Sequence, residues 1–337
     1  MLNIGVIGAG RIGAIHAANV AASPKARLTW VCDPVPGAAA RLAEFGARAS
    51  LDPAEVIAAD DVDAIVVCSP TPTHVGLILA GVEIGKAVLC EKPVDLDSDR
   101  ARECQQAVEA AAGKVMIGFN RRFDPTFAQV HARLRDGEIG KIEQLTIVSR
   151  DPSAPPVSYI AQSGGIFRDM TIHDFDMANF FLGPIETVLA LGQNVVDPQI
   201  AEAGDSDAAV VLLKAASGAV GTIINSRRCA YGYDQRLEAF GSLGMLEGRN
   251  QHATSVALST STFSQAANRV QDFFLQRYAE AYRLELDAFI EAVAGNGEFS
   301  PSLADGVAAL ALADAALESS KTGLAVAPVG GIAEATG

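Results

Sequence analysis

Three residues of this sequence have types and spacings suited to proton transfer. Asp169, His173 and Asp176 follow one another at i, i+4 and i+7, and a helix is predicted over residues 168–182. On such a helix all three side chains share one face. One carboxylate can orient the imidazole and stabilise its protonated form, so His173 is a candidate general base. A structural histidine or a metal site would fit the same pattern, although no cysteine or second histidine lies nearby in the sequence to favour zinc.

A second candidate site lies at the N-terminus, where a short apolar run ends in a GxGxxG turn at residues 8–13. Gly8 permits the tight turn, Gly10 lets the backbone approach a pyrophosphate, and Gly13 lets the next helix pack closely. Asp33 ends the following strand, where a carboxylate can bind both hydroxyls of an adenosine ribose. The order strand, glycines, helix, strand, acid predicts a dinucleotide site.

Lys92 stands directly after an apolar strand predicted at residues 87–90, in the run Glu91-Lys92-Pro93. In an open parallel sheet, ligands bind beyond the carboxyl ends of the strands. Lys92 is therefore placed to reach the nicotinamide end of a bound cofactor. A solvated lysine at a strand end is the alternative interpretation.

Alternating strand and helix signals predict an α/β Rossmann domain, a doubly wound parallel sheet, over residues 1–120. After that point several strands follow one another without helices between them, which is typical of an antiparallel sheet. We therefore expect residues 121–337 to form an α+β C-terminal domain with a large, mostly antiparallel sheet. The expected strands are 4–7, 27–32, 64–68, 87–90 and 115–118, then 141–150, 185–194, 207–214, 218–227, 235–241 and 254–258. The later helices are expected at 125–136, 168–182, 273–294 and 301–321, with a loop at 151–163 and a loose tail from Val326 to Gly337.

The net charge of −14 argues against binding to nucleic acid or to an anionic membrane surface. No apolar run reaches the roughly 18 residues of a transmembrane helix, and no signal peptide is recognisable. Five scattered cysteines fit buried thiols in a reducing compartment better than disulfides or zinc. The expected location is the cytoplasm.

The glycine turn, Glu91-Lys92-Pro93, residues 118–124 and the Asp169–His173 pair occur together and in order along essentially the whole chain. Together they resemble the glucose–fructose oxidoreductase, inositol dehydrogenase and rhizopine-catabolism (Gfo/Idh/MocA) family. Within it, the similarity is greatest to the inositol 2-dehydrogenases, at residues 119–124, 173–176, 231–234 and 281–285.

This resemblance implies roles for matching residues. Lys92 is expected to contact the reacting hydroxyl and the nicotinamide ribose, and His173 to accept the proton with Asp169 as its partner. The implied NAD-binding residues are Gly8, Gly10, Arg11, Ile12, Gly13, Asp33, Ser69, Thr71, His74, Glu91, Lys92, Asn120 and Arg121. The implied substrate-binding residues are Lys92, Arg121, Asp169, His173, Asp176, Tyr233 and Tyr282, and no metal is expected.

Some of these residues have simpler interpretations. His74 can be a residue that starts a helix, Asn120 and Arg121 can form a junction between domains, and Tyr282 can be a helix-packing residue. Arg11, inside the glycine turn, could tolerate a 2′-phosphate, yet Asp33 would oppose it, so NAD is expected over NADP.

The resemblance implies an NAD-dependent dehydrogenase for a secondary alcohol of a cyclic polyol, first of all myo-inositol, which would be oxidised to 2-keto-myo-inositol in polyol catabolism. A scyllo-inositol or aldose dehydrogenase of the same family is the alternative, and a non-catalytic NAD-binding regulator is the alternative of another class. The family implies a homotetramer, with a dimer as the second possibility. Apolar residues on both faces of the strands at 207–214 and 218–227 agree with a partner sheet.

Overall fold

The computed structural model describes residues 1–330, which divide into two compact units. The first unit contains residues 1–123 and 281–310, and the second contains residues 124–280 and the chain from Ala311 onward. The sequence places a single boundary at 120, whereas in the structure residues 281–310 pack with the N-terminal unit. Within the described part of the chain, no helix has the length and apolar character needed to cross a membrane.

The first unit is built on six parallel strands in the order β3-β2-β1-β4-β5-β6. This confirms the doubly wound parallel sheet. Strand β3 was not expected, because it has three residues, two of them exposed, and no apolar run. The strands are β1 Leu2–Ile7, β2 Ala26–Cys32, β3 Arg48–Ser50, β4 Ala64–Val67, β5 Ala87–Glu91 and β6 Val115–Gly118. The helices among them are α1 Arg11–Ala22, α2 Ala38–Ala43, α3 Pro53–Ala58, η1 Thr71–Thr73, α4 His74–Glu83, α5 Ser98–Ala110 and η2 Asn120–Phe123.

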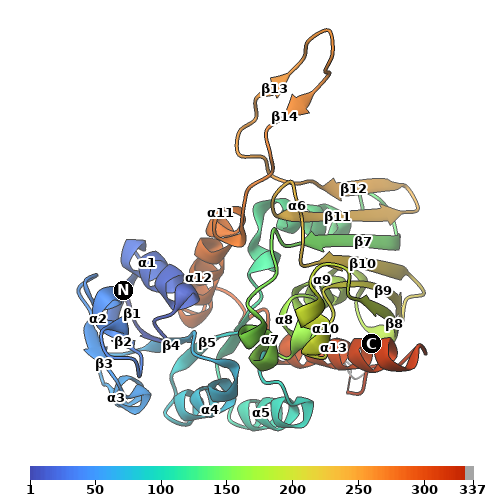
Figure 1. Cartoon of the computed structure of the whole chain (residues 1–337). Helices are drawn as coiled ribbons and strands as arrows, with labels where there is room; N and C mark the ends of the chain where they lie inside the picture. Colours follow the sequence, from blue (N-terminus) through green and yellow to red (C-terminus); the bar gives the residue numbers. More distant parts are fainter. Residues whose placement is uncertain (331–337) are drawn as a thin grey trace. The chain divides into compact units, whose positions relative to one another are not determined.

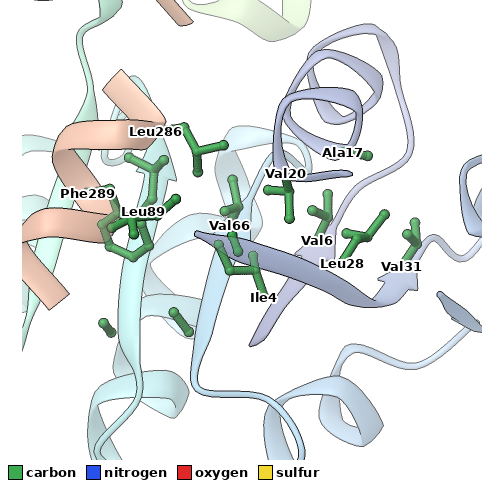
Figure 2. Close-up of a cluster of buried hydrophobic side chains, with 14 of the residues drawn as sticks. Ile4, Val6, Ala17, Val20, Leu28, Val31, Val66, Leu89, Leu286 and Phe289 are labelled. Carbon is green, nitrogen blue, oxygen red and sulfur yellow. The ribbon is translucent and has the colours of Figure 1, made fainter. Parts of the chain in front are cut away.

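Helix α12 (Ala279–Val293) belongs to the core of the first unit. Figure 2 shows Leu286 and Phe289 of α12 beside Leu89 and Val66 of the parallel sheet. All four side chains are at most 1% exposed, so the helix buries apolar surface that the N-terminal segment alone would leave in water. The apolar period of α12 therefore explains why this late segment returns to the first unit.

The second unit contains a six-stranded sheet in the order β12-β11-β7-β10-β9-β8 (Figure 1). Strands β7 and β10 run parallel and every other neighbouring pair is antiparallel, which confirms the mostly antiparallel sheet. The strands are β7 Ile142–Arg150, β8 Ile185–Gln193, β9 Ala208–Ala215, β10 Val220–Ser226, β11 Asp234–Gly241 and β12 Gly244–Gly248. The helices are α6 Pro125–Arg135, α7 Val157–Ser163, α8 Gly165–Asp169, α9 Ile172–Leu182, α10 Pro198–Glu202, α11 Phe274–Arg277 and α13 Leu303–Thr322, whose start belongs to the first unit.

The two faces of this second sheet differ. Helix α9 packs on β7 and β10, and residues such as Val211 and Leu213 of β9 are buried. Their neighbours in the same strand, Val210 and Leu212, point the other way and are 39% and 49% exposed. Phe240 of β11 is also exposed, at 43%. One face is therefore covered by helices, and the opposite face presents apolar side chains.

Several local expectations about the second half were wrong. The loop expected at 151–163 contains helix α7, and the segment expected as a strand at 254–258 forms only β13 (Ala257–Leu258), paired with β14 (Ala266–Ala267) outside the large sheet. The helix expected at 273–294 is interrupted at Tyr278, whose buried hydroxyl donates a hydrogen bond to Gln235. In the tail, Val326 pairs with Val188 of β8, and residues 331–337 lie outside the described residues.

Candidate functional site

The glycine turn between β1 and α1 is shaped by contacts that only glycine allows. Gly8 has a φ of +100°, and a Cβ there would lie 2.6 Å from the backbone of Cys68. A Cβ on Gly13 would lie 1.8 Å from the carbonyl oxygen of Gly8. Around Gly10, by contrast, no described atom lies within 4 Å of that position. The turn thus leaves a cradle at Gly10, at the N-terminal end of a twelve-residue helix, as a pyrophosphate requires.

Asp33 lies where the ribose-binding acid of a dinucleotide site is expected. One carboxylate oxygen accepts a hydrogen bond from the Ala9 amide at 2.8 Å, and the other accepts one from the Val35 amide at 2.9 Å. The first contact ties the acid directly to the glycine turn. These two bonds fix the carboxylate beside the cradle while leaving further lone pairs for ribose hydroxyls.

His74 is the first residue of α4 and is only 1% exposed. Its Nδ1 lies 2.8 Å from the Pro93 carbonyl oxygen, and its Nε2 lies 2.8 Å from the Ser69 carbonyl oxygen. Because both ring nitrogens face backbone carbonyls, we interpret His74 as a residue that joins the Ser69 loop to the Lys92-Pro93 turn. In this interpretation, His74 positions the two loops and does not itself contact the cofactor.

The remaining candidates of the first unit gather at the carboxyl ends of β4, β5 and β6. Ser69 and Thr71 follow β4, Lys92 follows β5 and is partly exposed, and Arg121 follows β6 and is buried. Asn120 is buried beside it in η2. With the glycine turn and Asp33 after β1 and β2, the first unit brings all the expected cofactor residues to one edge of its sheet.

The candidate base lies in the second unit. Asp169 ends α8, and His173 is the second residue of α9, so the expectation of one continuous helix was wrong. The break has a local cause, because the backbone amide of Thr171 donates to the carbonyl oxygen of Ile166, five residues earlier, at 2.9 Å. The carboxylate of Asp169 also accepts a hydrogen bond from the hydroxyl of Tyr159 at 3.1 Å. Tyr159 belongs to α7, in the segment expected to be a loop.

A buried polar network that the sequence analysis missed holds α9 on the sheet. Asp174 is fully buried and accepts hydrogen bonds from Ser149 at 2.6 Å and from the Asn225 amide at 2.8 Å. The Asn225 side-chain oxygen accepts one from Thr171 at 2.6 Å. Ser149 and Asn225 are register partners on β7 and β10. The signal available in the sequence was the acid directly after His173 in a largely apolar helix.

The other substrate candidates are also buried. Asp176 is 1% exposed on α9, and Tyr233 is 6% exposed, with its ring edge-on to Phe273 and Tyr278. Tyr282 lies in the first unit on α12, so the structure assigns it to the same unit as Lys92.

Asp234, directly after Tyr233, anchors this segment. Burial alone would raise the pKa of the Asp234 carboxyl, but hydrogen bonds from Arg236, Tyr231 and Asn250 lower it to about 2. The carboxylate is therefore charged at any physiological pH, and it holds the Tyr231–Asp234 turn.

All five cysteines are free, and four are buried. Burial raises the pKa of Cys32 and Cys104 to about 11, and it also raises the pKa of Cys68 and Cys90 well above the ordinary value of a thiol. These thiols stay protonated and contribute no nucleophile. The described residues contain a single group of histidine, cysteine or acidic side chains with metal-binding spacing, formed by His16, Glu91 and Glu285 rather than by the residues around His173.

Both units match one family of known proteins. Residues 2–119 match the oxidoreductase family with an NAD-binding Rossmann fold, and residues 127–247 match the GFO/IDH/MocA C-terminal domain. The inositol 2-dehydrogenase of Rhizobium meliloti is 49% identical over 94% of this chain and 96% of its own length. The chain belongs to the Gfo/Idh/MocA oxidoreductases, and the resemblance found in the motifs is confirmed.

Solved structures agree with this family. A myo-inositol dehydrogenase from Corynebacterium glutamicum is 52% identical, with a TM-score of 0.94 over 97% of this chain and 98% of the other. A scyllo-inositol dehydrogenase from Lactobacillus casei, solved with NAD(H) and scyllo-inositol, is 29% identical, with a TM-score of 0.90 over 97% and 99% of the two chains. The cofactor of the first unit is NAD, as the glycine turn and Asp33 predict.

Two of the three glycines of the turn, Gly10 and Gly13, should respond differently to one added methyl group. Gly10→Ala should fold with an unchanged melting temperature, because its Cβ meets open space, yet lose most NAD affinity because the cradle is filled. Gly13→Ala should lower the melting temperature as well, because its Cβ would overlap the Gly8 carbonyl. Thermal unfolding and NAD titration of both variants provide the test. Unchanged NAD binding in Gly10→Ala would contradict this placement of the pyrophosphate.

Proposed function

We propose that this protein is an NAD-dependent dehydrogenase that oxidises a secondary alcohol of a cyclic polyol, first of all myo-inositol to its 2-keto product. The observation that carries the proposal is the near-complete alignment with an inositol 2-dehydrogenase at 49% identity. The candidate residues for each role, Lys92, Asp169 and His173, are all present in this chain. Their presence argues against a non-catalytic NAD-binding regulator.

Bound NAD supplies the hydride acceptor at C4 of its nicotinamide ring. In the proposed reaction, His173 takes the proton of the substrate hydroxyl as the C–H bond breaks. The Lys92 ammonium stabilises the negative charge that develops on the oxygen. Asp169 orients the imidazole, and its own carboxylate is held by the Tyr159 hydroxyl. Acid–base help of this kind is typically worth about 10² to 10⁴ in rate.

Arg121, Asp176, Tyr233 and Tyr282 are proposed to recognise the remaining hydroxyls of the polyol. A charged guanidinium and a carboxylate suit a ligand rich in hydroxyl groups, because each can form several hydrogen bonds. The relatives include both myo- and scyllo-inositol dehydrogenases. A panel of both inositols and several aldoses, assayed by NAD reduction, would identify the stereoisomer that this protein prefers.

The exposed face of the second sheet supports the proposed homotetramer. Leu191, Val210 and Leu212 lie on neighbouring strands, with Leu191 and Val210 in direct register. Farther along the same sheet, Phe240 of β11 pairs with Met245 of β12, and both are more than 40% exposed. An apolar sheet face of this kind is typical of a surface that another subunit covers. The free cysteines fit the proposed cytoplasmic location. The proposed role in polyol catabolism rests on the inositol dehydrogenases among the relatives.

Replacing the proposed base should remove turnover without removing the cofactor. His173→Ala should lower kcat on the best polyol by about 10² or more, with NAD affinity nearly unchanged, because the imidazole acts on the substrate proton. The control is His252→Ala, at an exposed histidine of the second unit, which should leave kcat unchanged. Lys92→Ala should impair both kcat and substrate KM. Near wild-type turnover in His173→Ala would make the histidine structural.

Asp33 should decide the choice of cofactor. We expect kcat/KM with NAD to exceed that with NADP by about tenfold to a hundredfold, because the carboxylate would face the 2′-phosphate at close range. Asp33→Ser should shrink this preference. Equal values for the two cofactors in the wild-type enzyme would show that Arg11 accommodates the phosphate.

The oligomeric state can be determined from the molecular mass in solution. Light scattering should give about 140 kDa, four copies of the 35.0 kDa chain. Leu212→Asp should reduce the mass, because it places a charge on the exposed sheet face. Leu51→Asp, at an exposed leucine of the first unit, is the matched control and should leave the mass unchanged. A wild-type mass of 35.0 kDa would reject the tetramer.

A further inference from the structure

Three ionisable side chains meet beneath the proposed cofactor edge of the first unit. His16 lies on α1, Glu91 ends β5 and Glu285 lies on α12, and one potential ligand atom from each falls within 4.8 Å of the others. His16 and Glu285 are both 0% exposed. The Nε2 of His16 is 2.9 Å from Oε1 of Glu91. Neither oxygen of Glu285 has a hydrogen-bond partner among the described residues.

The neighbours of Glu285 come from several elements. Just after β4, Cys68 is close enough to interact with Glu285, and burial, followed by the charge of Glu91, raises the pKa of the Cys68 thiol. From β5 it faces Glu91, and from α1 it faces His16. On its own helix, the ring of Tyr282 lies edge-on to His16, with 5.7 Å between the ring centroids. Burial raises the pKa of Glu285 well above its ordinary value, and the charge of Glu91 raises it further.

The two ring nitrogens of His16 have different surroundings. Its Nε2 faces a carboxylate oxygen, so the proton belongs on Nε2. Its Nδ1 is buried without a partner among the described residues. A bare ring nitrogen is cheaper to bury there than an N–H without an acceptor, which favours a hydrogen on Nε2 that donates to Glu91.

We propose that Glu285 is held as a neutral carboxylic acid whose proton points to Glu91, and that Glu285 and His16 together clamp Glu91 from two sides. Glu91 directly precedes Lys92, so the clamp fixes the turn that presents the lysine. Glu285 is thus a positioning residue. The ligand atoms of Glu285 and Glu91 lie within 4.8 Å of each other, so the proposed hydrogen bond requires a rotation of the Glu285 side chain toward Glu91. An acid–acid pair that shares one proton is the usual solution when two carboxyl groups lie close together in a buried site.

This proposal makes a prediction about stability that does not depend on the reaction. A carboxyl group whose pKa is raised on folding contributes stability that is fully present below its unfolded pKa and is lost as the pH rises toward the folded pKa. Glu285→Gln removes this pH-dependent loss while keeping the shape of the neutral acid. The variant should therefore gain stability relative to the wild type as the pH rises.

The first experiment compares melting temperatures of wild type and Glu285→Gln from pH 5 to pH 8.5. We expect the variant to melt higher by about 3 °C or more at pH 8.5, and the difference to shrink toward zero at pH 5. Glu291→Gln is the control on the same helix. Its carboxylate hydrogen-bonds Lys25, which lowers the pKa of Glu291, so its replacement should give no gain at high pH.

Two results would overturn the proposal. One is a Glu285→Gln variant that is less stable than wild type at pH 8.5, or that cannot be recovered folded, which would mean that Glu285 is ionised. The other is about one equivalent of divalent metal in the purified protein, with EDTA lowering the melting temperature of wild type but not of the variant. Infrared spectroscopy gives an independent readout, because the carbonyl band of a protonated acid should be present at pH 8 in wild type and absent in the variant.

Enzyme kinetics test the positioning role of Glu285. This test rests on the proposed function, because it measures oxidation of the polyol. Glu285→Ala should lower kcat/KM on the polyol by about tenfold or more, and Glu285→Gln should restore it to within about threefold of wild type. Equal loss in both variants would reject the positioning role. A wild-type protein without polyol dehydrogenase activity would reject the proposed function, while the pH dependence of stability would still test the state of Glu285.

Discussion

The first unit depends on the close approach of two backbone segments at its first turn. The carbonyl oxygen of Gly8 occupies the place where a side chain on residue 13 would begin, so α1 starts almost in contact with the end of β1. This contact aims the helix terminus at the cradle around Gly10. It also brings the Ala9 amide within hydrogen-bond distance of Asp33. The cofactor site is thus a consequence of backbone packing, and its side chains are few.

In the second unit, the main constraint is the burial of acidic side chains on helix α9. Helix α9 has acids at both 174 and 176 that are almost fully inaccessible to water. Buried carboxylates cost free energy unless donors surround them, and Ser149 and Asn225 supply the donors for Asp174. These donors come from two paired strands, so the orientation of the helix that carries His173 is set by the register of the sheet.

Features that depend on local backbone chemistry could be predicted from the sequence. The glycine turn, the acid twenty residues later and the strand ends at 68 and 91 follow from short patterns, and they place the cofactor residues on one edge of the sheet. The short strand β3 could not be predicted, because three residues without an apolar run have no periodicity. The break in the helix before His173 depends on Thr171, whose amide donates to Ile166 and whose hydroxyl donates to a strand more than fifty residues away.

Clusters of residues from distant segments could not be predicted from the sequence either. His16, Glu91 and Glu285 lie on three elements separated by most of the chain, and nothing in their spacing indicates that they meet. Tyr159 lies in a stretch rich in proline and serine that reads as a loop. Residues of this kind are found only once the sheet topology has brought their elements together.

The return of α12 to the parallel sheet has a consequence for synthesis on the ribosome. Leu286 and Phe289 complete a core whose first strands leave the ribosome almost three hundred residues earlier. The nascent N-terminal segment therefore exposes an apolar sheet face until late in translation, a situation that favours aggregation. Chains stopped after the first 120 residues would keep that face in water, so the dinucleotide-binding half of this protein is a product of the whole polypeptide.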